Sequence, residues 1–174
     1  MDSTPTPLIL TLQMEAASAA TFTQLRRRHF PPARNWLDAH ITLFNALPSR
    51  AFDEVLQDVA ELAAQTRAFS MRVERVRFLG AGVAFDLASP DALVLRRTLA
   101  ERWGHMLGRQ DLQWRGPLHV TVQNKVRPEV ARALHSELTR DFEPRDLDAT
   151  GLELWRYLGG PWQAVGTWGF EKTV

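Results

Sequence analysis

Apolar positions along the chain follow strand spacing in some segments and helical spacing in others. Strand-like alternation or short apolar runs occur at residues 8–15, 40–44, 69–78, 83–87, 118–126, 147–157 and 162–170. Apolar residues recur at helical spacing at residues 17–30, 52–63, 90–106 and 128–138. The pattern therefore predicts an α+β protein in which strands and helices alternate.

Local signals at the ends of these segments support the same boundaries. Ser89 and Pro90 are the preferred residues for the N-cap and the first position of a helix. A glycine-rich turn is expected at residues 80–82, and a hairpin loop at residues 158–161. Within residues 69–78 the alternation slips by one position, which predicts a β-bulge.

The order of elements repeats. Residues 1–79 and residues 80–174 each give strand, helix, strand, helix, strand, and the second half adds one more strand. We expect one domain covering residues 1–174, made of two duplicated lobes that can exchange strands. In this bilobal fold two antiparallel sheets face a central cleft, with the helices on the outside.

Composition excludes several classes of protein. A chain of 174 residues that is 45% hydrophobic can bury its own core. It has no cysteine, which rules out disulfides, thiol nucleophiles and thiolate metal sites and favours a reducing compartment, the cytoplasm. The N-terminal apolar run is too short for a signal peptide or a membrane span, so no membrane contact is expected. A net charge of +1 does not indicate a protein that coats nucleic acid.

Two short motifs suggest the chemistry. His40-Ile41-Thr42 and His119-Val120-Thr121 are both His-x-Thr, and they occupy the same place in the two halves. One such triplet is expected by chance, but two at equivalent places are not. Because residues i and i+2 of a strand share a face, each motif presents a histidine and a threonine to the same side. The residues expected on that side, as substrate contacts, are His40, Thr42, Phe44, His119, Thr121, Gln123 and Lys125.

A pair of imidazoles suits cleavage of a phosphodiester. One proton must leave the attacking water or hydroxyl, and another must reach the leaving oxygen. Histidine, with an ordinary pKa of about 6.5, can serve as general base or general acid near neutrality. Threonine hydroxyls can donate to the non-bridging oxygens, and the scheme needs neither a metal nor a cofactor. The alternative is that the imidazoles are structural groups that hydrogen-bond across the sheet.

The segments HITLF and HVTVQNK, their separation and the duplicated layout resemble the two-histidine (2H) phosphoesterases, which include the bacterial 2′-5′ RNA ligase family. The resemblance covers nearly the whole chain. It implies that His40 and His119 are the acid and base and that Thr42 and Thr121 contact the phosphate. It also implies a nucleotide or RNA terminus as partner, carrying a 2′,3′-cyclic phosphate or a 2′-5′ linkage.

The chain departs from the family at one position. Members often carry arginine five residues after the second histidine, where this chain has Asn124 followed by Lys125. By strand alternation Lys125 shares the face of His119, so we expect Lys125 to be the phosphate-binding cation or else a solvated edge residue. Two alternatives stay open: a nucleotide-binding or RNA-end-binding module without catalysis, and a 2′-5′ RNA ligase. We expect the protein to be a monomer.

The remaining histidines and tryptophans have simpler explanations. His29 ends a helix whose last turn is rich in arginine, which complements the helix dipole. His105 and His135 lie on predicted helices without a second ligand at metal-site spacing. Core packing is expected for most tryptophans, Trp103 and Trp168 among them. Those near predicted loops and the terminal hairpin, which can reach a cleft rim, are Trp36, Trp155 and Trp162.

Overall fold

The computed structural model describes residues 6–172 and follows the predicted order of elements. The strands are β1 (Leu8–Met14), β2 (Ile41–Leu47), β3 (Phe69–Phe78), β4 (Val83–Ala88), β5 (Leu118–Gln123), β6 (Arg145–Tyr157) and β7 (Trp162–Gly169). The helices are α1 (Ala16–His29), α2 (Phe52–Gln65), α3 (Pro90–Arg102), the short α4 (Arg109–Leu112) and α5 (Pro128–Arg140). Two 3₁₀ turns, at Pro32–Arg34 and Ser49–Ala51, precede β2 and α2. The prediction that the N-terminus forms neither a signal peptide nor a membrane span concerns in part residues 1–5, which lie outside the described residues.

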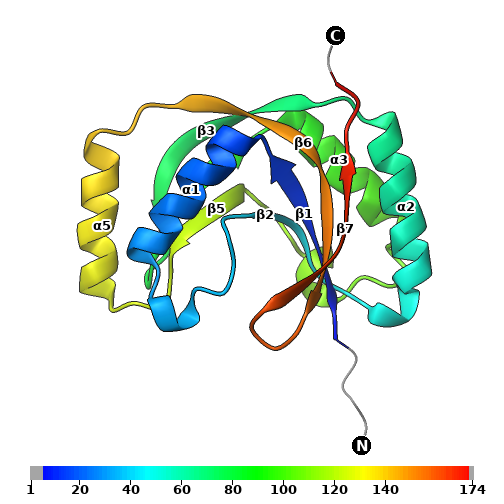
Figure 1. Ribbon diagram of the computed structural model, residues 1–174, viewed down its shortest axis with the longest axis horizontal. Helices are drawn as coiled ribbons and strands as arrows, with labels where there is room; N and C mark the ends of the chain where they lie inside the picture. Colours follow the sequence, from blue (N-terminus) through cyan, green and yellow to red (C-terminus); the bar gives the residue numbers. More distant parts are fainter. Residues whose placement is uncertain (1–5, 173–174) are drawn as a thin grey trace, which may run out of the picture.

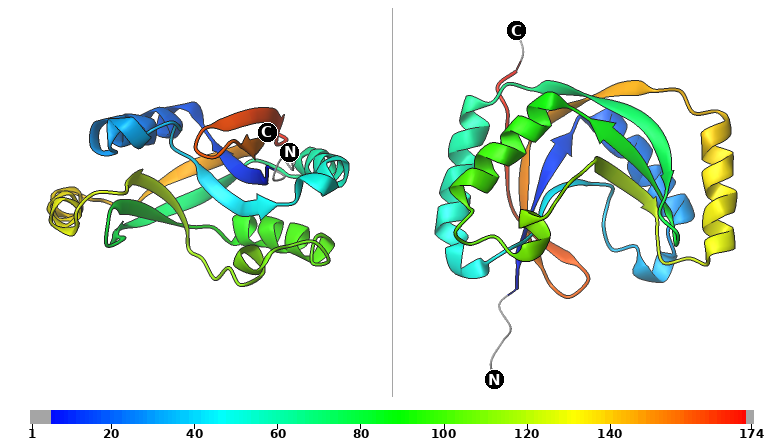
Figure 2. Two further views of the ribbon diagram at one scale, coloured as in Figure 1. Left: turned by 90° about the horizontal axis from the view of Figure 1, so that it is seen from below. Right: turned by 180° about the vertical axis from the view of Figure 1, so that it is seen from behind.

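The strands form one sheet that closes on itself. Its order is β1-β2-β5-β4-β3-β6-β7, and β1 also pairs with β6, which completes a barrel-like ring with β7 outside it. Figures 1 and 2 show this sheet between α1 and α5 at one end and α2 and α3 at the other. Two separate sheets were expected. Their strands join because the long β6 pairs with β3 through its first residues and with β1 through the rest.

The predicted apolar stripes of the helices supply the core. Side chains from four helices pack with the apolar faces of the strands in one cluster, in keeping with helices that cover the outside of a sheet. Helix residues in this cluster include Phe22, Val55, Val59, Ala63, Leu95, Leu99 and Leu134. Trp103 is fully buried against Phe44, as its predicted place in the core requires. None of the helices in residues 6–172 is long and apolar enough to cross a membrane.

The predicted helix start, turn and bulge are confirmed. Ser89 caps α3, accepting a hydrogen bond from the backbone N–H of Ala92, and Pro90 takes the first helical position. Gly80, in the turn between β3 and β4, adopts a φ of 86°, a conformation that glycine tolerates at little cost. The pairing of β3 with β4 shifts register between Val73 and Arg75, which is the slip seen in the sequence.

A bulge in β2 changes the face on which Phe44 lies. Leu10 pairs with Phe44, but the next residue, Thr11, pairs with Thr42, so Leu43 is an extra residue in β2. Leu43 and Phe44 are consequently both buried, with Phe44 fully inaccessible. The prediction that Phe44 shares the ligand-facing side of the strand is wrong, because strict alternation fails at a bulge.

The same irregularity occurs at the equivalent place in β5. Val83 pairs with Gln123 and the next residue, Ala84, pairs with Thr121, which leaves Val122 as the extra residue. Gln123 is only 3% exposed, and its Oε1 has no hydrogen-bond partner among residues 6–172. Gln123 therefore does not face a ligand, contrary to the prediction.

Lys125 is also displaced from its predicted face. β5 ends at Gln123, and Lys125 follows in a bend, exposed and with a φ of 62°. A residue in this left-handed conformation does not continue a strand, so the alternation that placed Lys125 beside His119 does not apply. The structure therefore gives no support for a contact between Lys125 and the phosphate.

Candidate active site

The two His-x-Thr motifs lie side by side. β2 and β5 are antiparallel neighbours, with Ile41 paired to Val120, the central residues of the motifs. Ile41 and Val120 are both fully buried, which turns the flanking histidines and threonines to the opposite face of the sheet. In this register His40 is a diagonal neighbour of His119, a relation that places Cα atoms about 7–8 Å apart.

Both imidazoles are held in the same way. Nδ1 of His40 lies 2.8 Å from the carbonyl oxygen of Asp38, and Nδ1 of His119 lies 3.3 Å from that of Pro117, in each case two residues back along the chain. Because a carbonyl oxygen only accepts, Nδ1 is the donor and Nε2 of each neutral ring keeps its lone pair. Neither Nε2 has a hydrogen-bond partner in the described part of the chain.

Burial favours the neutral form of His40. Desolvation lowers the pKa of His40 to about 4, partly offset by the bond to the Asp38 carbonyl, and the charges of Arg26 and His119 lower it further. The ring also packs against Trp162, with centroids 4.6 Å apart.

A charged cluster next to His119 modifies its basicity. Burial lowers the pKa of His119, and the hydrogen bond to the Pro117 carbonyl partly offsets it; Arg77 lowers the pKa further, whereas Asp86, paired with His119 on β4, raises it. Asp86 is 1% exposed, and its Oδ2 accepts a hydrogen bond from Nε of Arg75 at 2.7 Å. Nε of Arg77 lies 2.8 Å from Oδ1 of Asp86 without hydrogen-bond alignment. His119 thus has a carboxylate beside it that favours its protonated form.

Arg26 connects the surroundings of both motifs. It is 5% exposed, and its Nε donates to Oδ1 of Asn35 and to the carbonyl oxygen of Leu37, at 2.9 and 3.0 Å. Its Nη1 donates to the carbonyl oxygen of Thr121 at 3.0 Å. The guanidinium therefore ties α1 to the segment that leads into His40 and to the second motif.

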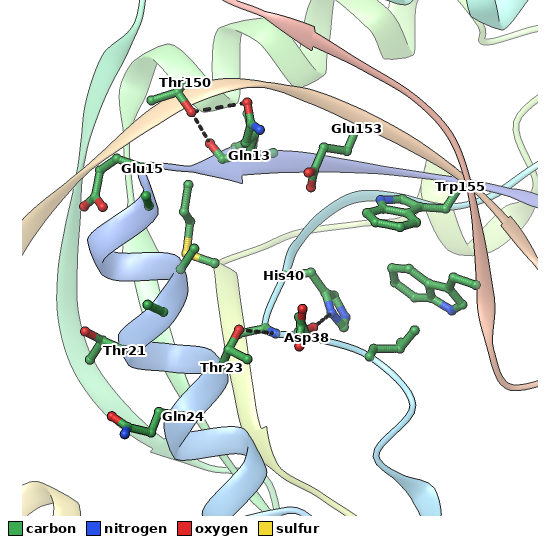
Figure 3. A pocket seen from close by; sticks show the side chains of 18 of the residues that line it. Gln13, Glu15, Thr21, Thr23, Gln24, Asp38, His40, Thr150, Glu153 and Trp155 are labelled. Atoms are coloured by element: carbon green, nitrogen blue, oxygen red, sulfur yellow. Dashed lines mark hydrogen bonds between the residues drawn. The ribbon is translucent and has the colours of Figure 1, made fainter.

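A pocket of about 1500 Å³ opens beside His40 (Figure 3). It is bounded by α1, the end of β1, the segment before β2 and the β6–β7 hairpin. The residues that line it include Trp36, Trp155 and Trp162, together with Glu153. Figure 3 shows the side chains of His40 and Glu153 both directed into this space.

The other motif residues are not part of the pocket lining. Thr42, His119 and Thr121 are partly exposed and lie one and two strands further across the sheet. Thr42 still connects with the pocket, because it pairs with Thr11, which in turn pairs with Glu153. Strand pairing therefore connects the pocket with the first motif through Thr11, which is itself fully buried.

Three residues of this site were not predicted from the sequence: Arg26, Asp86 and Glu153. Arg26 is one of several arginines at the end of α1, although it is the one at the spacing of the buried Phe22. Asp86 is a charged residue within the apolar run of β4. A charge in such a run indicates a buried ion pair, and this signal was present in the sequence. Among residues 6–172, no group of three or more His, Cys, Asp or Glu side chains is placed to hold a metal ion.

Several solved structures share this fold. A structure of TT0787 from Thermus thermophilus aligns with a TM-score of 0.66 at 14% identity, covering 97% of this chain and 100% of that one. E. coli LigT complexed with 3′-AMP aligns with a TM-score of 0.62 at 14% identity, covering 97% and 99%. LigT complexed with phosphate gives a TM-score of 0.56 at 17% identity, with the same coverage.

The sequence itself matches a family model. No curated protein matches the chain, but the model described as the 2′-5′ RNA ligase superfamily matches residues 14–161. This span includes both His-x-Thr motifs and the strands that carry them. The chain belongs to the 2′-5′ RNA ligase superfamily of two-histidine phosphoesterases.

Proposed function

We propose that the protein is a metal-independent phosphodiesterase that acts on nucleotide or RNA-end phosphodiesters, either 2′,3′-cyclic phosphates or 2′-5′ linkages. The observation that supports the proposal is the pairing of Ile41 with Val120, because residues on either side of a paired position share the opposite face of the sheet, which fits two histidines and two threonines acting together. The nucleotides named in the LigT complexes fit a substrate of this class.

His40 is the general base in this proposal. Its surroundings favour the neutral ring, since burial and two positive neighbours oppose protonation. Nε2 removes a proton from the attacking water as the water oxygen bonds to phosphorus.

We assign His119 as the general acid, because the hydrogen bond to the Pro117 carbonyl and the carboxylate of Asp86 favour its protonated form, against burial and Arg77. Its Nε2–H donates a proton to the leaving ribose oxygen as the P–O bond breaks, and the products are a phosphomonoester and a free hydroxyl. The acid and base roles reverse for ligation.

The hydroxyls of Thr42 and Thr121 hold the non-bridging oxygens. We expect Thr42→Val and Thr121→Val each to lower kcat/KM by about tenfold, because a hydrogen bond to a charged group is worth about 1.5–3 kcal/mol and valine keeps the shape of threonine. Steady-state kinetics on a nucleoside 2′,3′-cyclic phosphate measure this. Thr98→Val is a matched control, since its hydroxyl donates to the Val94 carbonyl on the exposed face of α3. A loss no greater than in the control would remove the threonines from the site.

The pH dependence follows from the lowered pKa values. The base must be neutral and the acid protonated, so kcat/KM is highest between the pKa of His40, about 4, and that of His119, which lies below its ordinary 6.5. Activity should fall as pH rises above the pKa of His119, that is, already below its ordinary 6.5, and also as pH drops towards the pKa of His40. Rates from pH 4 to 8 in buffers of constant ionic strength test this, and an optimum above pH 7 would contradict the assignment.

The same assay separates the two alternatives. Turnover of 2′,3′-cyclic phosphates with EDTA present favours the phosphodiesterase, whereas tight binding without turnover indicates a binding module. Joining of RNA ends through a 2′-5′ bond would indicate the ligase. A net charge of +1 favours a small nucleotide over long RNA, and binding that weakens only slightly with salt would agree.

We further propose that the chain is a single domain made of two lobes, residues 1–79 and 80–174, facing a cleft that holds the substrate. Support comes from the shared order of elements and from the bulges that follow each His-x-Thr motif at the same place. The exchanged strand is β6, which belongs to the second half and pairs with β1 and β3 of the first half. A monomer in the cytoplasm remains our expectation.

A further inference from the structure

A carboxylate and three tryptophans share the pocket beside His40. Glu153 comes from β6, Trp155 from the same face of that strand, Trp162 from β7 and Trp36 from the segment before β2. None of them takes part in the proton transfers proposed above. The combination of flat apolar rings with one acceptor group is suited to a flat ligand that carries hydrogen-bond donors.

Hydrogen bonds fix the relative positions of these groups. Nε1 of Trp155 donates to Oγ1 of Thr11 at 3.0 Å, and that hydroxyl donates to Oε2 of Glu153 at 3.4 Å. The same hydroxyl lies 3.5 Å from the backbone carbonyl oxygen of Glu153, so its single hydrogen is shared between two acceptors of that residue. Trp155 and Glu153 are therefore oriented before any ligand arrives.

The carboxylate of Glu153 is short of donors. No ion pair reaches it in residues 6–172, and Oε1 has no hydrogen-bond partner there. Arg27, which also lines the pocket, pairs with Asp38 instead. Burial accordingly raises the pKa of Glu153, with the bond from Thr11 as a partial offset. A ligand that supplies two N–H groups would satisfy both oxygens.

The tryptophans line the side of the pocket formed by the β6–β7 hairpin. The ring centroids of Trp155 and Trp162 are 6.0 Å apart, and Trp162 contacts His40. Trp36 is 57% exposed and packs against the tip of the β6–β7 hairpin, where a Cβ on Gly160 would come within 2.1 Å of its ring. Bases stack on aromatic side chains of this kind with about 1–3 kcal/mol each.

The pocket is at the right place for the base of a substrate whose phosphate lies between the histidines. Glu153 pairs with Thr11, and Thr11 pairs with Thr42, so Glu153 is two strand spacings, about 10 Å, from the first motif. This span suits a nucleoside with its ribose over β1 and β2. The base would then reach Glu153 with its Watson–Crick edge.

Resting on the proposed function, we propose that this pocket binds the nucleobase and selects guanine through Glu153. Guanine presents two adjacent donors on that edge, N1–H and the 2-amino group, which match the two oxygens of a carboxylate. Adenine and cytosine place a ring-nitrogen lone pair beside their amino group, and uracil flanks its single N–H with carbonyl oxygens. Each of these would set a lone pair against the carboxylate.

Kinetics with the 2′,3′-cyclic phosphates of guanosine, inosine and adenosine test the proposal. We expect kcat/KM for guanosine to exceed that for adenosine by about 10- to 100-fold, in the range of one bidentate base contact, with inosine between them because it lacks the 2-amino group. Glu153→Gln should abolish the preference, since its amide presents one acceptor and one donor. Glu101→Gln, an exposed residue of α3, is the matched control and should retain it.

A binding measurement separates failure of this inference from failure of the proposed function. Calorimetry with guanosine and adenosine 2′-monophosphates requires no turnover. Tighter binding of the guanosine compound that depends on Glu153 supports the base pocket even if no cyclic phosphate is hydrolysed. Equal affinity for the two, or equal hydrolysis of all three cyclic phosphates by wild type, overturns guanine selection and leaves the phosphodiesterase proposal intact.

Discussion

Replacing either histidine of the pair should lower activity on nucleoside 2′,3′-cyclic phosphates by about 10² to 10⁴, the usual contribution of one general acid or base. His40→Ala and His119→Ala each remove one proton transfer and leave the other. The effect belongs mainly to kcat, because the threonines and the pocket continue to bind the substrate. Steady-state kinetics in the presence of EDTA provide the measurement.

His105→Ala is the matched control for this experiment. His105 is exposed beyond the end of α3, where its Nε2 lies 3.2 Å from Oε1 of Glu54, far in the sequence from both motifs. Its loss should leave the rate within about twofold of wild type. Circular dichroism and thermal unfolding establish that all three variants fold. Unchanged activity in His40→Ala or His119→Ala would remove that residue from the chemistry.

The second large effect is expected at Arg26. Arg26→Met keeps most of the side-chain length but removes three hydrogen bonds, to Asn35, Leu37 and Thr121. Bonds from a charged donor contribute about 1.5–3 kcal/mol each, and the buried acceptors lose their partner. We expect the free energy of unfolding to fall by about 3 kcal/mol or more, and kcat/KM to fall by at least tenfold as the segment before His40 loosens.

Urea unfolding and kinetics on the same preparations test this expectation. Arg28→Met, in the same turn of α1 but exposed, is the control and should change stability by less than about 0.5 kcal/mol. Arg26→Lys should recover part of the stability. It should not restore all three hydrogen bonds, because an ammonium group cannot donate in several directions from one plane as a guanidinium does. A loss in Arg26→Met no larger than in Arg28→Met would contradict the role of Arg26 as a link.

The sequence predicted the elements well because each is encoded locally. The apolar stripe of α2, the Ser89-Pro90 start of α3 and the slip in β3 all depend on residues close in the chain. The closed sheet was not predictable in this way. It depends on β6 pairing with both β1 and β3, and pairings over such separations leave no trace in alternation.

The candidate site was predicted as far as alternation holds. Ile41 and Val120 are buried and the flanking histidines and threonines turn to the other side, as period-two spacing requires. One residue beyond each motif a bulge intervenes, and the predicted faces of Phe44, Gln123 and Lys125 fail together. Alternation is regular up to each of these two bulges, so, unlike the slip in β3, they were not predicted from the sequence.

The sequence analysis also missed two residues whose contacts lie far away in the sequence, Arg26 and Glu153. Only its spacing from Phe22 sets Arg26 apart in the sequence from Arg27 and Arg28, yet of the three it alone is buried and reaches β5. Glu153 lies in an ordinary alternation between Leu152 and Leu154. Its importance comes from the pairing of β6 with β1, which sets it beside Thr11 and in line with Thr42.

A crystal structure with inorganic phosphate bound tests the central claim most directly. If the two motifs serve one phosphorus atom, phosphate will lie between the rings, with Nε2 of His40 and Nε2 of His119 each about 2.7–3.2 Å from one of its oxygens. Phosphate bound to only one histidine, or rings that turn away from a common ligand, would contradict the account.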